Sequence, residues 1–274
     1  MVGKPTVGRI ICIANRKGGV GKTTTAINLA AALAVNGDPT LLIDCDPQGN
    51  ATSGVGVRLE PDSPTIYDVL LGACTLEEAK QPTAIAQLDV VPANHDLIGA
   101  EVELLNAERR EYHLHSLLRP YREQYRYLLI DCPPSLGLLT VNALTAADSV
   151  LVPVQSEYYA LEGLRSLLET LTLIRERLNP ELAIEGILLT MFDARNKLCH
   201  QIAEEVRRFF PQTVFDATIP RNVRLSESPS HGLPVILYDP SCRGAQSYVE
   251  LAREVTRRDP LAWTTGPRTE GMAQ

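Results

Sequence analysis

Short apolar runs alternate with stretches of helical periodicity along most of this chain. Residues 9–14 (Arg-Ile-Ile-Cys-Ile-Ala) predict a buried strand, and residues 22–36 predict a helix that Gly37 stops. Further strands are expected at 40–44, 127–131, 148–154, 184–190 and 214–219, and further helices at 97–108, 112–123, 138–147, 161–178, 198–210 and 242–258. Residues 51–96 show no clear period and are expected to be irregular.

This alternation indicates an α/β fold. Near-continuous apolar strands separated by helices predict a mostly parallel, twisted sheet with helices on both faces. Such sheets bind ligands at the carboxyl ends of their strands. We expect a single domain over residues 1–258. Residues 259–274 carry Pro and Gly without periodicity, so they are expected to form a disordered tail.

Composition narrows the class of protein. The chain has 274 residues, 45% of them hydrophobic, which is enough for a deep core. Its six cysteines form no C-x-x-C pair, and no segment resembles a signal peptide or a membrane span, so a cytoplasmic protein with reduced thiols is expected. Because the formal net charge is -7, binding to nucleic acid would require a local basic patch.

A glycine-rich loop follows the first predicted strand and opens the first predicted helix. It consists of Lys17, Gly18, Gly19, Val20, Gly21, Lys22, Thr23 and Thr24. Glycines let backbone amides approach phosphate closely, and the helix N-terminus adds partial positive charge. Lys22 can reach the β and γ phosphates, and the Thr23 hydroxyl can ligate Mg²⁺. The run therefore predicts a P-loop NTPase fold, although Arg16 stands where the strict loop pattern has glycine.

Acidic residues end two further predicted strands. Asp44 and Asp46 end the second strand, and Asp131 ends the third. These carboxylates are expected at the same edge of the sheet as the phosphate loop, with Asp131 in the Mg²⁺ shell through water and Asp46 positioning the attacking water.

The sequence favours ATP over GTP. Guanine is usually read by an N-K-x-D run, and the nearest run here, at 196–199, lacks the aspartate. Pro220 and Asn222 follow the last predicted strand and are expected to border the base.

Several of these motifs resemble those of a known protein family. The loop at 17–24, the run D-C-D-P-Q-G-N at 44–50 and the run D-C-P-P at 131–134 are similar to those of the ParA/MinD group of deviant Walker A ATPases. Segments 153–163, 189–195 and 219–227 resemble the chromosomal ParA proteins, also called Soj. The resemblance covers about residues 8–258. Asn196 and Arg16 depart from the usual family residues, threonine and glutamine.

The resemblance implies a function and a set of roles. ParA proteins form an ATP sandwich homodimer, bind DNA without sequence preference, and hydrolyse ATP slowly until a ParB-type partner stimulates them. Lys17 matches the signature lysine that reaches the partner protomer's ATP, and Thr24 matches a further phosphate contact. Asp46 matches the water-positioning acid and Asp131 the Walker B acid. Arg195 and Arg224 match DNA-contacting arginines, which implies association with the nucleoid.

Other functions of this fold would leave other signs in the sequence. An iron-protein reductase would need two cysteines in glycine-rich loops that bridge a dimer, and Cys132 stands beside Pro133 instead. A MinD-like membrane-associated regulator would need a basic amphipathic helix at the C-terminus, and residues 259–274 offer one Trp, one Leu and one Met among mainly polar residues. A metabolic phosphoryl-transfer enzyme would need a second polar cluster for its substrate, and the sequence suggests none. The expectation is therefore a DNA-partitioning ATPase without membrane attachment.

Overall fold

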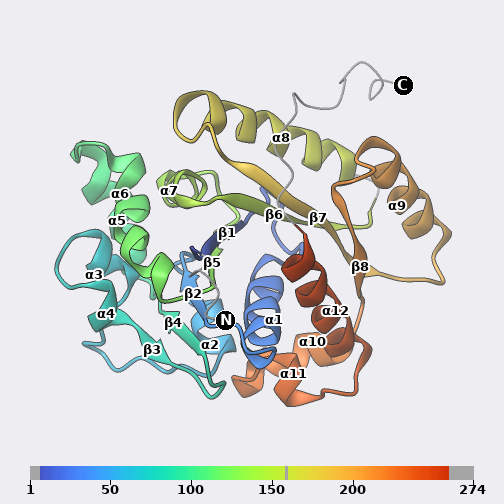
Figure 1. Cartoon of the computed structure of the whole chain (residues 1–274), viewed down its shortest axis with the longest axis horizontal. Coiled ribbons are helices and arrows are strands. Elements are labelled where there is room, and N and C mark those ends of the chain that lie inside the picture. The colour runs from blue at the N-terminus through green and yellow to red at the C-terminus, as the bar shows by residue number, and fades with distance from the viewer. Residues whose placement is uncertain (1–6, 158–159, 259–274) are drawn as a thin grey trace, which may run out of the picture.

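Eight strands form one twisted sheet in the computed structural model, which describes residues 7–157 and 160–258 (Figure 1). The strands are β1 (Arg9–Ile13), β2 (Thr40–Asp44), β3 (Gln81–Pro82), β4 (Leu88–Val91), β5 (Tyr127–Asp131), β6 (Ser149–Gln155), β7 (Ala183–Phe192) and β8 (Val214–Pro220). Their order across the sheet is β3-β4-β2-β5-β1-β6-β7-β8, and every neighbouring pair except β3 and β4 is parallel. The predicted mostly parallel sheet is confirmed.

Helices cover both faces of this sheet. One face packs against α3 (Ile66–Leu70), α4 (Leu76–Ala79), α5 (Leu97–Glu103), α6 (His113–Leu118), α7 (Leu138–Ala146), α8 (Ala160–Arg177) and α9 (Lys197–Phe209). The other face packs against α1 (Lys22–Val35), α2 (Asn50–Gly54), α10 (Val223–Glu227), α11 (Val235–Tyr238) and α12 (Arg243–Arg257). Figure 1 shows α1 and α12 side by side in front of the sheet.

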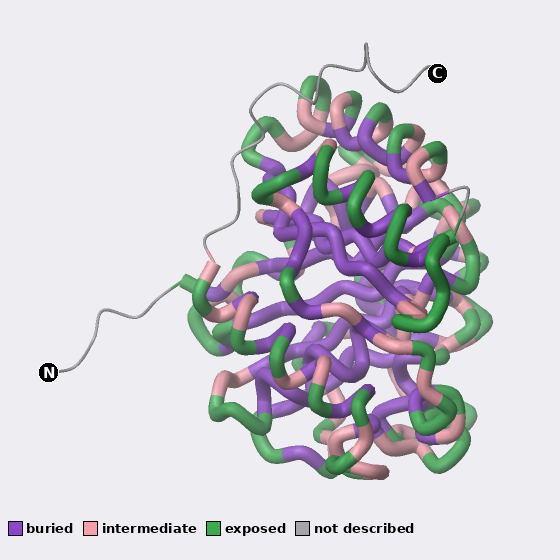
Figure 2. The backbone as a smooth tube through the Cα atoms, turned by 90° about the vertical axis from the view of Figure 1, so that its right-hand side faces the viewer, coloured by how far each residue is buried: buried purple, intermediate pink, exposed green. Residues whose placement is uncertain are grey.

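The core follows from the alternation of side chains along each strand. In β1, Ile10 and Cys12 belong to one buried cluster, and Ile11 and Ile13 belong to the other. Because both faces are covered, each central strand is apolar on both sides, and this is why the strands read as continuous apolar runs. Figure 2 shows the buried strands as a layer between partly exposed helices.

Several predicted boundaries were wrong. Residues 51–96 are ordered and contain α2, α3, α4, β3 and β4. The helix expected over 97–108 ends at Glu103 and continues as a 3₁₀ turn to Asn106, because the backbone becomes extended at Ala107. The helix expected over 112–123 becomes 3₁₀ after Leu118, since Pro120 lacks the amide that an α-helix would use there.

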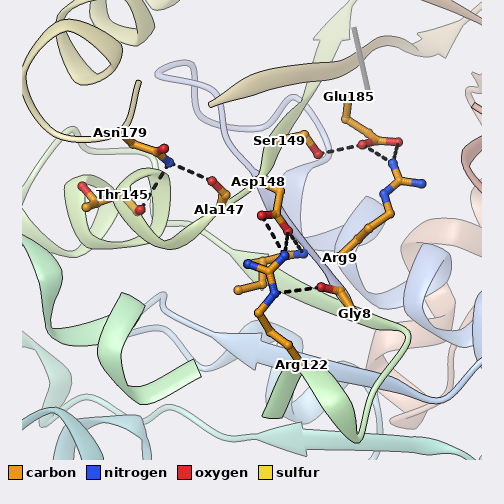
Figure 3. Close-up of polar contacts among 10 residues, drawn as sticks. Gly8, Arg9, Arg122, Thr145, Ala147, Asp148, Ser149, Asn179 and Glu185 are labelled. Carbon is orange, nitrogen blue, oxygen red and sulfur yellow. Dashed lines mark hydrogen bonds and ion pairs between the residues drawn. The ribbon is translucent and has the colours of Figure 1, made fainter. Parts of the chain in front are cut away.

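Two polar clusters join the strands at the amino end of the sheet (Figure 3). Arg9 pairs with the fully buried Glu185, which also accepts a hydrogen bond from Ser149 at 2.6 Å. Arg9 donates as well to the Val255 carbonyl at 3.1 Å, near the end of α12. These contacts hold β1, β6, β7 and α12 together at the edge of the sheet away from the phosphate loop.

Arg122 and Asp148 form the second cluster. Arg122 binds the Asp148 carboxylate at 2.8 Å and the Gly8 carbonyl at 3.0 Å, and Asp148 also accepts the Ile10 amide (Figure 3). The predicted tail, residues 259–274, lies outside the described residues. Within the described ranges, no helix is both long enough and apolar enough to cross a bilayer.

Candidate nucleotide site

The glycine-rich loop connects β1 to α1, as predicted. Asn15 anchors its start by donating to the Pro153 carbonyl at 2.7 Å and accepting the Lys17 amide at 3.0 Å. Thr190, near the end of β7, anchors its end by donating to the Val20 carbonyl at 2.8 Å. Gly21 has a φ of 89°, a left-handed conformation that favours glycine. Strands β6 and β7 therefore hold both ends of the loop.

The two lysines of the loop have different surroundings. The Lys22 side chain is buried, and its Nζ donates to the Lys17 carbonyl at 3.2 Å. Burial lowers the pKa of Lys22, and the charge of Asp131 is the largest of the opposing effects. The Lys17 side chain is partly exposed and pairs with Glu157 at 3.0 Å. Lys22 therefore lies inside the loop, and Lys17 lies at the surface of the protein.

Asp44 has a structural role at the end of β2. Its carboxylate accepts hydrogen bonds from the Thr52 amide at 2.8 Å, the Thr52 hydroxyl at 2.7 Å and the Asp46 amide at 3.1 Å. Burial nevertheless raises the pKa of Asp44 to about 6. This aspartate fixes the start of the turn that carries Asp46.

Asp46 is the residue that the sequence assigns to water positioning. It is largely buried, and its Oδ1 accepts the Gln48 amide at 3.0 Å. The charge of Asp46 acts on both Lys22 and Asp131, so the three side chains share one site. The hydrogen bond from the Gln48 amide orients the carboxylate through one of its two oxygens.

Asp131 is the residue that the sequence assigns to the magnesium shell. It is fully buried, and neither carboxylate oxygen has a hydrogen-bond partner. Burial raises the pKa of Asp131 well above its ordinary value, and the charge of Asp44 raises it further. The nearby Thr23 side chain acts in the opposite direction and lowers the pKa of Asp131. Its hydroxyl lies close to the carboxylate but does not form a hydrogen bond of ordinary geometry with it. Buried carboxylates without partners are costly, so this one fits a hydrated cation bound beside Thr23.

A cavity of about 700 Å³ lies beyond the carboxyl ends of β7 and β8. It is lined by Phe192, Asp193, Ala194, Arg195, Thr218, Pro220, Arg221, Asn222, Arg243, Gln246, Ser247 and Glu250. The two residues expected to border the base, Pro220 and Asn222, are both part of this lining. The Asn222 side-chain oxygen accepts the Arg224 amide at 2.8 Å and so caps α10. Thr190, which binds the Val20 carbonyl of the phosphate loop, lies on β7 two residues before Phe192 of this lining.

The two arginines expected to contact DNA follow these same strands. Arg195 is 90% exposed and pairs with Asp193 at 3.0 Å, and Arg224 is half-exposed and pairs with Glu227 at 2.8 Å and Asp239 at 3.3 Å. Exposed pairs of this kind contribute little to stability. Breaking these pairs would therefore cost little free energy.

The structure adds site residues that the sequence reading missed. Asn15 and Thr190 anchor the loop, and Glu157 holds Lys17. Met191 takes a left-handed backbone conformation with a φ of 50°, between Thr190 and the cavity lining. Such strain in a residue other than glycine is concentrated at functional sites. Glu157, Thr190 and Met191 lie in segments that resemble the family, but the sequence does not show their roles, because those roles depend on contacts across the sheet.

Comparison with known proteins identifies the family. A family model described as an AAA domain matches residues 8–184. The chain is 58% identical to the chromosome partitioning protein ParA of Myxococcus xanthus over 94% of this chain and 91% of the relative. It is 54% identical to the sporulation initiation inhibitor protein Soj of Bacillus subtilis over 91% of this chain and 98% of the relative.

A solved structure shares the fold and was determined with ligands. This is a cobyrinic acid a,c-diamide synthase from Mycobacterium smegmatis with a bound ATP analogue and magnesium. It is 35% identical to this chain, with a TM-score of 0.81, over 94% of this chain and 100% of that structure.

Proposed function

Because this chain belongs to the ParA/Soj family of chromosome-partitioning ATPases, we propose that it is an ATP-driven switch that partitions DNA. Membership in this family implies ATP hydrolysis. In the proposed cycle, ATP joins two protomers into a sandwich dimer, the dimer binds DNA without sequence preference, and a ParB-type partner stimulates hydrolysis and release. The observation that carries this proposal is the buried Lys22 beside Asp131, with Asp46 and the exposed Lys17 at the same edge of the sheet.

The phosphate loop, Asp131 and the cavity beside β7 and β8 would make the nucleotide contacts. Amides of residues 18–24 would bind the phosphates, and Lys22 would exchange the Lys17 carbonyl for phosphate oxygens. Thr23, and Asp131 through water, would hold Mg²⁺, which neutralises charge on the β and γ phosphates when bound. Within the described ranges, no cluster of three His, Cys, Asp or Glu residues forms a separate metal site. The cavity lined by Pro220 and Asn222 would hold the adenine.

Hydrolysis would use Asp46 and the partner protomer's copy of the signature lysine. Asp46 would orient a water molecule toward the γ phosphate, since its carboxylate is already positioned by Gln48. Lys17 would leave Glu157 and cross the dimer interface, because an exposed ion pair costs about 1 kcal/mol or less to break. Two ATP molecules that face each other repel, and a cation from each side offsets this repulsion and the charge of the transition state.

DNA binding would use Arg195 and Arg224 from both protomers. A chain with a net charge of -7 repels a polyanion unless its cations are gathered locally. A dimer doubles the number of arginines on one surface and makes binding bivalent. Contacts to phosphates carry no sequence information, so we expect binding without sequence preference.

The test is a salt titration of DNA affinity with ATP, with ADP and without nucleotide. With ATP, wild-type protein should bind, and the double variant Arg195→Ala/Arg224→Glu should lose affinity and salt dependence while still dimerising. Each lost phosphate contact lowers the slope of log K against log salt by about 0.9. Arg165→Ala is the matched control, since Arg165 on α8 is also exposed and paired, with Glu169. Tight binding without nucleotide would refute the ATP requirement, and unchanged binding by the double variant would refute the surface.

A further inference from the structure

A single buried amide side chain connects the helix of the phosphate loop to a distant part of the chain. Asn28 is the only polar residue of α1 from Ala26 to Val35, and it is 2% exposed. Its Nδ2 donates to the Thr24 carbonyl at 2.8 Å, in the first turn of the helix. Its Oδ1 accepts the Val235 amide at 2.7 Å, from a residue 207 positions later in the chain. Asn28 therefore joins the start of α1 to α11.

The hydrogen bond between Asn28 and α11 should persist when α1 moves. Val235 is the first residue of α11, so its amide has no partner within that helix, and the preceding Pro234 offers no side-chain cap. Val235 is also fully buried. An amide in this position would be left unpaired away from water if it separated from Asn28, and such groups are costly. A shift of α1 should therefore carry α11 with it.

Helix α11 ends beside Arg224, one of the two arginines expected to contact DNA. It has four residues, packs against α1 and α10 (Figure 1), and is followed by Asp239. Asp239 pairs with Arg224 at 3.3 Å, and the Tyr238 ring lies 6.0 Å from the guanidinium carbon. The Tyr238 hydroxyl also donates at 3.3 Å to Glu227, the other partner of Arg224. One end of α11 is thus bound to Asn28, and the other carries neighbours of Arg224.

The position of Asp239 determines how strongly Arg224 can attract DNA. The ion pair is weak, but a carboxylate at this distance offsets the charge of the guanidinium group and repels a phosphate that approaches it. A shift of α11 that withdraws Asp239 would leave Arg224 able to bind phosphate. Such a shift can begin at the nucleotide, because Thr24 is a proposed phosphate contact and its carbonyl binds Asn28.

We propose that Asn28 is a positioning residue that connects the nucleotide bound at Thr24, through α11, to the DNA contact of Arg224. The inference rests on the proposed function, since it uses the nucleotide and DNA contacts assigned there. It adds a step within each protomer. Dimerisation brings the arginines of two protomers together, and Asn28 makes the charge of Arg224 available only when ATP is bound.

The experiment compares Asn28→Ala with a matched change, Asn142→Ala. Asn142 lies on α7 and is also 2% exposed. Its Oδ1 accepts the Leu114 amide near the start of α6 at 3.2 Å, and its Nδ2 donates to the Leu138 carbonyl of its own helix at 3.1 Å. Each change is made alone and together with Arg224→Ala. The probe is duplex DNA of arbitrary sequence, titrated over a range of salt concentrations with ADP and with a non-hydrolysable ATP analogue.

With the ATP analogue, Asn28→Ala should bind DNA at least about fivefold more weakly than wild type. The slope of log K against log salt should fall by about 1.8, because both copies of Arg224 in a dimer lose a phosphate contact worth about 0.9 each. Its DNA affinity with ADP, its ATP binding and its dimerisation should equal those of wild type. Together with Arg224→Ala, Asn28→Ala should cause no further loss, whereas a general loss of stability would add to it. Asn142→Ala should match wild type.

Equal DNA affinity of wild type and Asn28→Ala with the ATP analogue would overturn the inference, and so would a further loss in the double variant. Loss of ATP binding or of dimerisation in Asn28→Ala would also overturn it, since the effect of Asn28 would then lie at the nucleotide site.

A second measurement needs no change at Asn28. Hydrogen exchange of the amides of residues 235–239 in wild type should differ between ADP and the ATP analogue, and equal exchange would overturn the inference. If wild type binds DNA equally well with the two nucleotides, the ATP requirement of the proposed function falls, and the inference falls with it.

Discussion

Replacing Lys22 with methionine should abolish tight ATP binding. Methionine keeps an unbranched apolar side chain of similar length and removes only the ammonium group. The side chain is buried, so its contact with phosphate would be made largely out of water. Truncating one partner of a buried charge pair costs about 2–5 kcal/mol, which corresponds to a loss of affinity of about 30- to 4,000-fold.

The fold should survive this change. The charge of Lys22 lowers the pKa of Asp131, whose carboxylate oxygens have no hydrogen-bond partner. Because burial already raises the pKa of Asp131, this carboxyl can take up a proton when Lys22 is lost and so avoid an unpaired buried charge. Circular dichroism should therefore show a cooperative thermal transition in Lys22→Met.

The matched control is Lys17→Met, in the same loop. Lys17 is partly exposed and paired with Glu157, so the affinity of a single protomer for nucleotide should change only a few-fold. The assay is calorimetric titration with magnesium and a non-hydrolysable ATP analogue at protein concentrations that keep the protomers apart. Affinity of Lys22→Met within about threefold of wild type would refute the assignment of the phosphate loop. Equal losses of nucleotide affinity in the two variants would contradict the different roles assigned to Lys22 and Lys17.

Three further changes test other parts of the site. Asp46→Ala should keep ATP binding and dimerisation but slow hydrolysis by about 10²- to 10⁴-fold, and a variant that hydrolyses at the wild-type rate would contradict the role of Asp46. Gly18→Val should fold normally, because a Cβ at Gly18 meets nothing within 4 Å in one protomer. Light scattering with ATP should nevertheless find only monomers of this variant, and a normal dimer would exclude a sandwich in which the loops face each other. Since the pKa of Asp44 is raised to about 6 in the folded protein and is about 4 when unfolded, its contribution to stability should fall as the pH rises through this window, by about 3 kcal/mol at most. Urea unfolding of wild type and Asp44→Asn from about pH 4 to about pH 7 measures this difference, and a difference independent of pH would contradict it.

The sequence predicted the sheet well because its central strands are short and apolar on both sides. The bounds of β2 and β5 agree with expectation to the residue, and both end in the aspartates that face the site. Residues 51–96 were harder to predict. The strand β4 has four residues, and β3 has two and includes a proline, so neither produces a recognisable period.

The candidate site also contains residues that the sequence could locate and residues that it could not. Residues 17–24 could be located from the sequence because a phosphate loop needs a contiguous run of glycines, a lysine and a hydroxyl. Thr190 could not be located, because it acts by donating to a carbonyl 170 residues earlier in the chain. One ion pair of Arg224 also depends on tertiary structure, because its partner Asp239 lies beyond α11 in the chain.

The contacts of Arg9 bring the first and last described segments of the chain to one place. Its guanidinium group binds the carbonyls of Val255 and Arg258, at 3.1 and 3.3 Å. Arg9 begins β1, whereas the phosphate loop leaves the other end of that strand. A label attached at Gly8 or Arg258 would therefore lie on the side of the sheet opposite the phosphate loop. If two protomers join as proposed, labels of two colours placed there would report the distance between them without lying between their phosphate loops.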